Sequence, residues 1–294
     1  MTRHEFGGDW TTEKLERVRK YLQAYTTIFH GNARAQKLFF TYVDAFAGTG
    51  VRSPPEAASG PPELLPDTTR PEVERFLKGS ARIALEVEPP FKHYLFIERD
   101  PARAKQLEKL KADLPARAAQ VEIVVGDANV YLTQWCADTD WRLHRAVVFL
   151  DPYGMQVDWS LIEAIAKTHA IDLWLLFPLG IAVNRLLTRT EPPVEWARAL
   201  TRIFGTEEWR EAFYPKRTRL TLFGEEDSHE KQADFDRIGQ FFVERLQTVF
   251  TDVADNPLPL FNTKGVPLYL LCFAVGNPKG APTAIRIAQH ILRR

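Results

Sequence analysis

Hydrophobic positions along this chain follow a helical period at first and then gather into short runs. Within residues 11–30, five apolar positions recur at helical spacing behind a threonine pair that can cap a helix: Leu15, Val18, Leu22, Tyr25 and Phe29. Continuous apolar runs then predict strands at 39–43, 94–97, 121–125, 146–150 and 173–177. Helical segments separate the last four: 101–112, one through Trp135, and 159–168. Apolar strands that alternate with helices predict a parallel sheet covered on both faces.

The remaining segments complete a single doubly wound domain over residues 1–294. We expect an N-terminal helical cap over 1–38 and a proline-rich surface insertion over 51–79, because six prolines between 51 and 72 exclude a regular helix or central strand. Residues 180–247 are predicted to be a mostly helical insertion. Extended segments near 249–254 and 267–275 and a helix over 281–292 close the chain.

Composition narrows the class of protein. Of 294 residues, 45% are hydrophobic, and 38 basic side chains balance 38 acidic ones, which excludes a disordered chain and a protein coated in positive charge. Two cysteines make no disulfide framework, and the seven histidines show no metal-ligand spacing. The apolar stretch 171–183 is too short to span a bilayer, and the first residues do not resemble a signal peptide. We therefore expect a cytoplasmic protein without a membrane segment or a metal.

Candidate chemistry lies where the strands end, since ligands of open parallel sheets bind beyond the carboxyl ends of strands. The first strand ends in Asp44-Ala45-Phe46-Ala47-Gly48-Thr49-Gly50. Glycines there let a ligand approach the backbone, and they equally suit a tight turn. The segment is not G-x-G-x-x-G and has no following Lys-Ser/Thr, which disfavours a dinucleotide site and a P-loop.

Acidic residues follow the next two strands. Glu98, followed by Arg99, can accept both hydroxyls of a ribose, because an ionised carboxylate is acceptor-only; otherwise it neighbours a helix cap. Asp127, just before a turn at Ala128, can bind an adenine amino group or cap a helix.

The fourth strand ends in Asp151-Pro152-Tyr153-Gly154. This tetrapeptide suits a type I turn. It also suits a site in which Asp151 and a following carbonyl accept hydrogens from an exocyclic amine while Tyr153 stacks on the ring. Phe177 and Pro178, after the fifth strand, are candidate walls of that site.

Together these residues resemble the class I S-adenosylmethionine-dependent methyltransferases, whose fold is a Rossmann-like, mainly parallel, seven-stranded sheet with a reversed seventh strand. The resemblance implies S-adenosyl-L-methionine as cofactor, held by residues 44–48, Gly50, Glu98, Arg99, Asp127 and Ala128. It implies catalytic roles for Asp151, Pro152 and Tyr153, with Gly154 in the same substrate motif. Phe177 and Pro178 stay candidate walls of the site, and Arg185, which follows the fifth strand, is a candidate contact for substrate phosphates or part of a solvated surface.

A narrower resemblance runs through nearly the whole chain. It rests on residues 42–48, Gly79-Ser80, 96–100, 149–154 and Pro267-Leu268-Tyr269, which are similar to those of the bacterial three-Cys-motif partner family (TcmP). Members of that family are usually encoded beside a radical-SAM-like protein that carries three cysteines. The resemblance thus implies such a partner.

The substrate motif departs from the common pattern. Methyltransferases of adenine or cytosine amino groups commonly carry Asp/Asn-Pro-Pro-Tyr/Phe, whereas this chain lacks the second proline, and Asp-Pro-aromatic-Gly is nearer to some tRNA guanine-N2 methyltransferases. We expect methylation of an exocyclic amino group of a nucleobase in DNA or RNA. The alternatives are a cofactor-binding scaffold without transfer activity and, more remotely, a nicotinamide-dependent oxidoreductase. Substrate and oligomeric state stay open.

Overall fold

The computed structural model describes residues 9–47, 79–221, 224–228 and 230–293, with the side chains of all of these except Asp9 and residues 217–228. At its centre lies a sheet whose main path has the order β3-β2-β1-β4-β5-β10-β8. The five predicted strands are confirmed to within two residues and are mutually parallel: β1 (Phe39–Asp44), β2 (His93–Glu98), β3 (Val121–Val125), β4 (His144–Leu150) and β5 (Ile171–Phe177).

The closing strands reverse direction. β10 (Pro267–Val275) runs antiparallel between β5 and the short β8 (Asp252–Val253). This seven-strand path has the reversed strand that the sequence predicts. An eighth strand, β9 (Leu258–Phe261), also pairs with β10. The sequence did not predict β9, because Pro257 and Pro259 resemble a break; a strand paired on one side tolerates such prolines.

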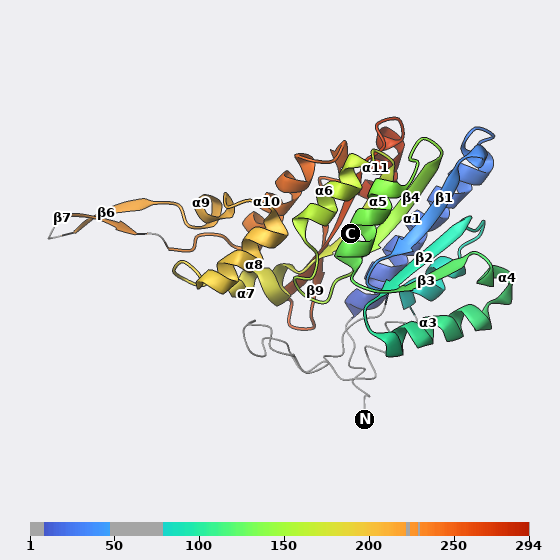
Figure 1. Cartoon of the computed structure of the whole chain (residues 1–294). Helices are drawn as coiled ribbons and strands as arrows, with labels where there is room; N and C mark the ends of the chain where they lie inside the picture. Colours follow the sequence, from blue (N-terminus) through green and yellow to red (C-terminus); the bar gives the residue numbers. More distant parts are fainter. Residues whose placement is uncertain (1–8, 48–78, 222–223, 229, 294) are drawn as a thin grey trace, which may run out of the picture.

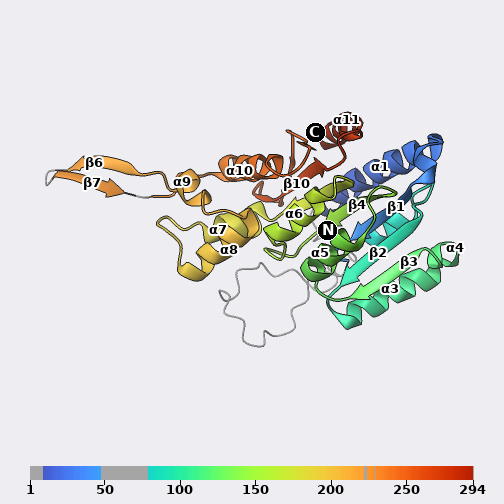
Figure 2. The same cartoon turned by 45° about the horizontal axis from the view of Figure 1, so that its top comes forward.

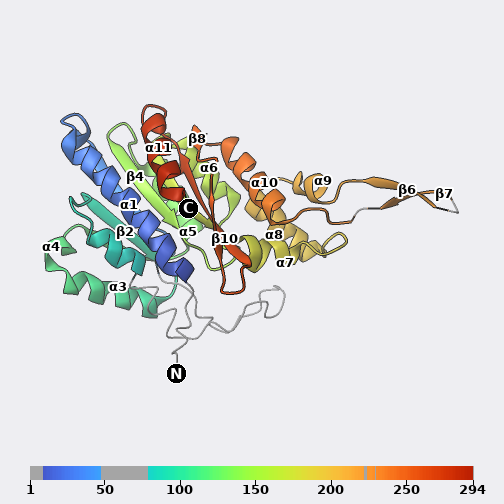
Figure 3. The ribbon, with the colours of Figure 1, turned by 180° about the vertical axis from the view of Figure 1, so that it is seen from behind.

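Helices cover both faces of the sheet, as predicted (Figures 1 and 3). One face carries α1 (Asp9–Gly31), the helical residues 79–85, α3 (Pro101–Asp113) and α11 (Ala281–Leu292). The opposite face carries α5 (Ala128–Asp138), α6 (Trp159–Lys167), α8 (Val194–Phe204) and α10 (Phe235–Gln247). Two short helices, η1 (Ala35–Lys37) and α4 (Pro115–Ala118), lie in connections.

Alternation along each strand divides the core between the two faces. Tyr42, Phe96 and Phe149 are buried on the α1 side, whereas their chain neighbours Val43 and Val148 are buried on the α5–α6 side. This parity decides which way each strand-end residue points.

α1 begins at Asp9, before the predicted start, and lies along the sheet. Its apolar residues pack in the core, and the Tyr21 hydroxyl donates a 2.7 Å hydrogen bond to the buried Asp172 carboxylate of β5. The Arg17 guanidinium donates to the backbone carbonyls of Ile291 and Arg293 at the end of α11. α1 is therefore joined both to the sheet and to the last helix.

Residues 180–247 contain the predicted helices, the last of them α10, and in addition a hairpin that the prediction lacked. The segment between β5 and α10 contains η2 (Leu179–Val183, a π-helix), α7 (Asn184–Leu186), α8 and α9 (Trp209–Phe213), but also an antiparallel hairpin of β6 (Arg217–Thr221) and β7 (Gly224–Ser228) that projects far from the sheet (Figure 2). Sequence periodicity missed the hairpin because the sequences of its two strands are mostly polar and show no alternation of apolar residues.

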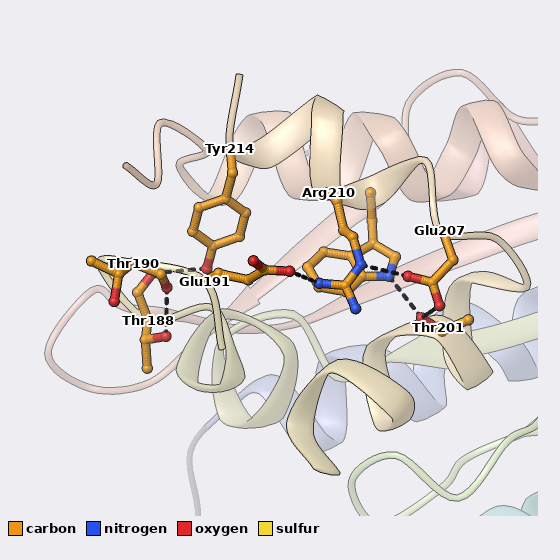
Figure 4. Close-up of polar contacts among 8 residues, drawn as sticks. Thr188, Thr190, Glu191, Thr201, Glu207, Arg210 and Tyr214 are labelled. Atoms are coloured by element: carbon orange, nitrogen blue, oxygen red, sulfur yellow. Dashed lines mark hydrogen bonds and ion pairs between the residues drawn. The ribbon is translucent and has the colours of Figure 1, made fainter. Parts of the chain in front are cut away.

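Polar contacts fix the base of this hairpin (Figure 4). The Tyr214 hydroxyl donates a 2.8 Å hydrogen bond to the backbone carbonyl of Thr188. The Arg210 guanidinium donates to Glu207 at 2.6 Å and also pairs with Glu191. α9 is thereby fastened to the segments before and after α8.

The residues 1–8 and 48–78 lie outside the described part of the chain, so most of the predicted proline-rich insertion is not placed. Among the described residues, no helix is both long enough and apolar enough to cross a lipid bilayer.

Gly205 provides a test of the packing on the α5–α6 side. It ends α8 with a φ of 68°, and a Cβ there would lie 2.0 Å from the ring of the buried Trp159. We expect Gly205→Ala to lower the free energy of unfolding in urea by about 2–4 kcal/mol, from backbone strain and overpacking together.

Gly265→Ala is the matched control, because Gly265 has a φ of 73° but open space around its Cβ position. It should show the strain alone, about 1 kcal/mol. Equal losses in the two variants would contradict the packing of α8 on Trp159.

Candidate active site

Three buried carboxylates converge on the α1 side of the sheet at the carboxyl ends of adjacent strands. Asp44 ends β1, Glu98 ends β2 and Asp151 follows β4 directly. Each continues the parity of the α1-side residues Tyr42, Phe96 and Phe149. Asp44 is level with Phe96 and Phe149, so Glu98 and Asp151 each lie two positions further along.

Asp44 is buried without a normal hydrogen bond. Ser80 and the backbone of Phe46 are near enough to lower its pKa, yet neither carboxylate oxygen has a partner of acceptable geometry among the described residues. Burial dominates, and the neighbouring Asp151 adds to it, so that the pKa of Asp44 rises to about 7. A buried acceptor of this kind is costly unless a ligand supplies the donors.

The segment after β1 is fixed to both neighbouring strands. The Ala45 amide donates to the Phe149 carbonyl at 3.1 Å, and the Ala47 amide donates to the Ile97 carbonyl at 3.0 Å. The predicted cofactor residues Ala45, Phe46 and Ala47 thus lie at the sheet edge between the other acids. Gly48 and Gly50 are outside the described residues.

Glu98 is buried and partly satisfied. Its Oε1 accepts a 2.6 Å hydrogen bond from the Asp100 amide, and the Arg103 guanidinium lies 3.9 Å away. Burial, stronger than these contacts, raises the pKa of Glu98 to about 7. Arg99, also predicted to contact the cofactor, is exposed.

Asp127 lies at the end of the next strand, exposed, and is the N-cap of α5. Its Oδ1 accepts from the amides of Asn129 and Val130 at 2.9 and 3.3 Å. Ala128 is therefore the first residue of a helix and not part of a turn. The capping role is observed; a contact with adenine stays a prediction.

Asp151 forms a buried ion pair with the first helix. The Lys14 ammonium, fully buried, lies 2.6 Å from Asp151 Oδ2. Trp10 and Phe149 flank the ammonium, with ring centroids 5.5 and 5.8 Å away. Burial raises the pKa of Asp151, while the charge and hydrogen bond of Lys14 lower it.

The residues after Asp151 form a bend that lacks the hydrogen bond of a type I turn. The Tyr153 amide donates instead to the Gln156 side chain at 2.9 Å, and Gly154 has a φ of 81°. Pro152 is buried, whereas Tyr153 is half-buried and close enough to Tyr269 of β10 to influence its pKa.

Two side chains from neighbouring helices hold this bend in place. Asn129 donates to the Gln156 carbonyl at 2.8 Å and accepts from the Asp158 amide at 2.9 Å. Arg202 of α8 pairs with Asp158 at 3.1 Å and donates to the Met155 carbonyl at 3.1 Å. The loop that carries Asp151 and Tyr153 is thus clamped from α5 and α8.

The other predicted substrate residues, Phe177, Pro178 and Arg185, differ from these acids in their surroundings. Phe177 is fully buried, and its ring stacks on Phe242 with centroids 3.9 Å apart, which gives it a packing role. The Pro178 carbonyl accepts from two amides of η2. Arg185 is exposed on α7.

A hollow of about 640 Å³ lies elsewhere, between α10 and the segments around β9 and β10. Apolar and acidic residues line it, among them Phe235, Phe261, Asp236 and Glu244. None of the strand-end acids borders it, so the chemistry of the site points to the carboxyl edge of the sheet and not to this hollow.

Comparison with known proteins adds little beyond the fold. No protein-family model matches the sequence, and no curated protein matches it significantly. Among solved structures, it is similar to the protein LPL1258 from Legionella pneumophila, described with the family DUF519 (12% identity, covering 98% of this chain and 92% of that chain, TM-score 0.49).

Two further similar structures are described as enzymes. A putative S-adenosylmethionine-dependent methyltransferase from Listeria monocytogenes shares 11% identity over 80% of this chain and 90% of its own, with a TM-score of 0.37. Spermidine synthase from Thermotoga maritima shares 10% over 98% and 72%, with a TM-score of 0.39. Similarity this low carries no chemistry. The strand order, with β10 reversed, defines a class I methyltransferase fold.

Lys14 is the site residue that sequence reasoning did not assign. It shares a helix face with Val18, Tyr21 and Tyr25, at spacings of four, three and four residues. A lysine on the apolar face of an amphipathic helix was the available signal. Its partner could be known only from the fold, since 137 positions separate Lys14 from Asp151.

The raised pKa of Asp44 predicts how stability depends on pH. The folded state favours protonated Asp44, so its contribution to stability is present at low pH and is lost as pH rises toward and through about 7. Glu98 and Asp172, whose pKa values are also raised to about 7, act in the same direction. Thermal unfolding should therefore show stability falling between about pH 4, the pKa of an unperturbed aspartate, and about pH 7, the pKa in the folded protein.

Asp44→Asn should reduce that fall by on the order of 3 kcal/mol, because the amide does not titrate. The exposed Asp113→Asn is the control and should leave the pH dependence unchanged. If the Asp44→Asn variant keeps the full wild-type pH dependence, ionisation of Asp44 does not lower the stability of the folded protein.

Proposed function

We propose that this protein binds S-adenosylmethionine and transfers its methyl group to an exocyclic amino nitrogen of a nucleobase. The observation that carries the proposal is the convergence of Asp44, Glu98 and Asp151 on one face of the sheet, at the carboxyl ends of β1, β2 and β4. In an open parallel sheet this edge is where ligands bind.

The residues present fit the cofactor. Asp44 offers two buried oxygens without partners among the described residues, which suits the amino group of the methionine moiety. Glu98, buried beside it, suits the ribose hydroxyls, and the exposed Asp127 suits the adenine amino group. When bound, the cofactor supplies an electrophilic methyl group.

The bend after β4 suits an amine acceptor. Asp151 would accept one amine hydrogen and the Pro152 carbonyl the other, while Tyr153 fixes the plane of the base. Methyl transfer would form a nitrogen–carbon bond as the sulfur–carbon bond of the cofactor breaks, and the methylated nitrogen would then lose its proton to solvent, so no strong general base is required. Such positioning can supply on the order of 7 kcal/mol of the barrier.

Partner and substrate class follow from the sequence resemblance alone. The similarity to the three-Cys-motif partner family supports a second protein with three cysteines, and the likeness of residues 151–154 to the substrate motif of amino-methyltransferases supports a nucleobase substrate. Asp-Pro-Tyr-Gly, with its aromatic residue directly after the proline, favours a target other than the adenine amino group. Mass spectrometry of nucleic acids from cells with and without the gene pair would identify the modified base.

A cofactor-binding subunit without transfer activity is the second candidate. It is favoured by the departure of Asp151-Pro152-Tyr153-Gly154 from the common substrate motif of amino-methyltransferases. Turnover by the isolated chain would exclude it, whereas turnover only after addition of the three-cysteine partner would favour a two-component enzyme.

Calorimetric titration with S-adenosylhomocysteine tests cofactor binding. We expect one site, with Glu98→Ala weakening the affinity about tenfold to a hundredfold, because the hydroxyl acceptors are lost. Glu108→Ala, an exposed acid on α3, should bind like the wild type. Preference for NAD over S-adenosylhomocysteine would overturn the proposal.

Transfer of a radiolabelled methyl group to nucleic acid from cells that lack the gene pair tests the role of Asp151. Asp151→Asn should lower transfer at least a hundredfold while S-adenosylhomocysteine still binds. Tyr153→Phe should be mild and Tyr153→Ala severe if the ring stacks on the base. If Asp151→Asn keeps wild-type turnover, residues 151–154 have only a structural role, as a bend after β4.

A further inference from the structure

The buried ion pair at the end of β4 is not explained by cofactor binding. α1 brings a fully buried lysine to the one acid that the proposed chemistry assigns to the substrate, at 2.6 Å. Burying a charge requires a partner, and burying a pair is often no more stable than apolar packing. An ion pair in this place therefore calls for a role beyond holding the helix.

The geometry divides the Asp151 carboxylate between two tasks. Lys14 engages Oδ2, and Oδ1 has no hydrogen-bond partner among the described residues. The ammonium is fully buried and lies 5.5 and 5.8 Å from the ring centroids of Trp10 and Phe149, which stabilise its charge. One oxygen is thus anchored to α1, and the other is left to accept a substrate hydrogen.

We propose that Lys14 is a positioning residue for methyl transfer: it keeps Asp151 ionised and orients its carboxylate so that Oδ1 faces the substrate amine. This inference rests on the proposed function of the same site. It assigns to the first helix a part in the reaction and not only in the fold.

The surroundings of Asp151 make such help necessary. Asp44 lies close enough on β1 to interact electrostatically with both Asp151 and Lys14, and Tyr42 on β1 and Tyr269 on β10 also face Asp151. Of these neighbours only Lys14 is cationic. Burial favours a protonated Asp151 carboxyl, whose protonated oxygen could no longer accept the amine hydrogen.

Carbon-13 NMR of aspartate labelled at the carboxyl carbon measures the effect without any substrate. Asp151→Asn assigns the Asp151 signal in the full-length protein. Lys14→Met should raise the titration midpoint of Asp151 by at least one pH unit, a tenfold rise in proton affinity, whereas Lys14→Arg should stay nearer the wild type.

Lys20→Met is the matched control. Lys20 lies on the same helix and pairs with Glu16 at 3.2 Å, but it is exposed. It should leave the Asp151 titration unchanged. If Lys14→Met does not fold, Lys14→Gln, which still donates a hydrogen bond without a charge, takes its place. An unchanged midpoint in a folded, uncharged Lys14 variant would overturn the inference.

The transfer assay separates positioning from mere support of the fold. Lys14→Met should lower kcat at neutral pH at least tenfold, with activity recovering at higher pH, while S-adenosylhomocysteine affinity stays within about twofold of the wild type. A loss of kcat that is independent of pH would assign Lys14 a structural role. If the wild type neither binds S-adenosylhomocysteine nor transfers methyl groups, the proposed function fails. The titration midpoints of Asp151 are measured without substrate, so they still show whether Lys14 keeps Asp151 ionised.

Discussion

Burial of carboxylates at the edge of the parallel sheet is the constraint on which this structure depends. Parallel pairing places the ends of β1, β2 and β4 side by side, and two-residue alternation turns Asp44, Glu98 and Asp151 toward the same face. Burial makes all three carboxyl groups resist ionisation, and the charge of Asp151 adds to this effect at Asp44. The partners of the three carboxylates differ. Glu98 has a backbone amide and an arginine, and Asp151 has the Lys14 ammonium. Asp44 has no normal hydrogen bond within the described residues.

This division of partners relates the fold to the proposed chemistry. An acid that the protein satisfies is a structural element, whereas an acid left without donors is a place for a ligand's donors. Asp44 belongs to the second kind. Asp151 stands between the two, with one oxygen bonded to Lys14 and the other available. Asn129 and Arg202 then fix the loop that follows, so the available oxygen keeps its direction.

Most of the fold could be predicted from the sequence, because five apolar runs and their helices have strong periods and because Asp44, Glu98 and Asp151 directly follow or end such runs. β9 and the β6–β7 hairpin could not: prolines obscured the first, and the sequence of the second is mostly polar and shows no alternation of apolar residues. Side-chain partners over long sequence distances, such as Lys14 with Asp151 and Tyr21 with Asp172, depend on how α1 crosses the sheet. The placement of α1 on the sheet cannot be predicted from the composition of the chain or from the spacing of its apolar residues.

The seating of α1 has a consequence for how the protein is made. The helix that carries Lys14 is synthesised early, but Asp151 follows 137 positions later, and the α11 carbonyl that Arg17 contacts follows 274 positions later. On a ribosome, the growing chain therefore exposes this helix, with its apolar face and its lysine, long before the partners of either exist. The charge of Asp151 is therefore balanced by Lys14 only late in folding, when the first helix packs on the sheet and on the last helix.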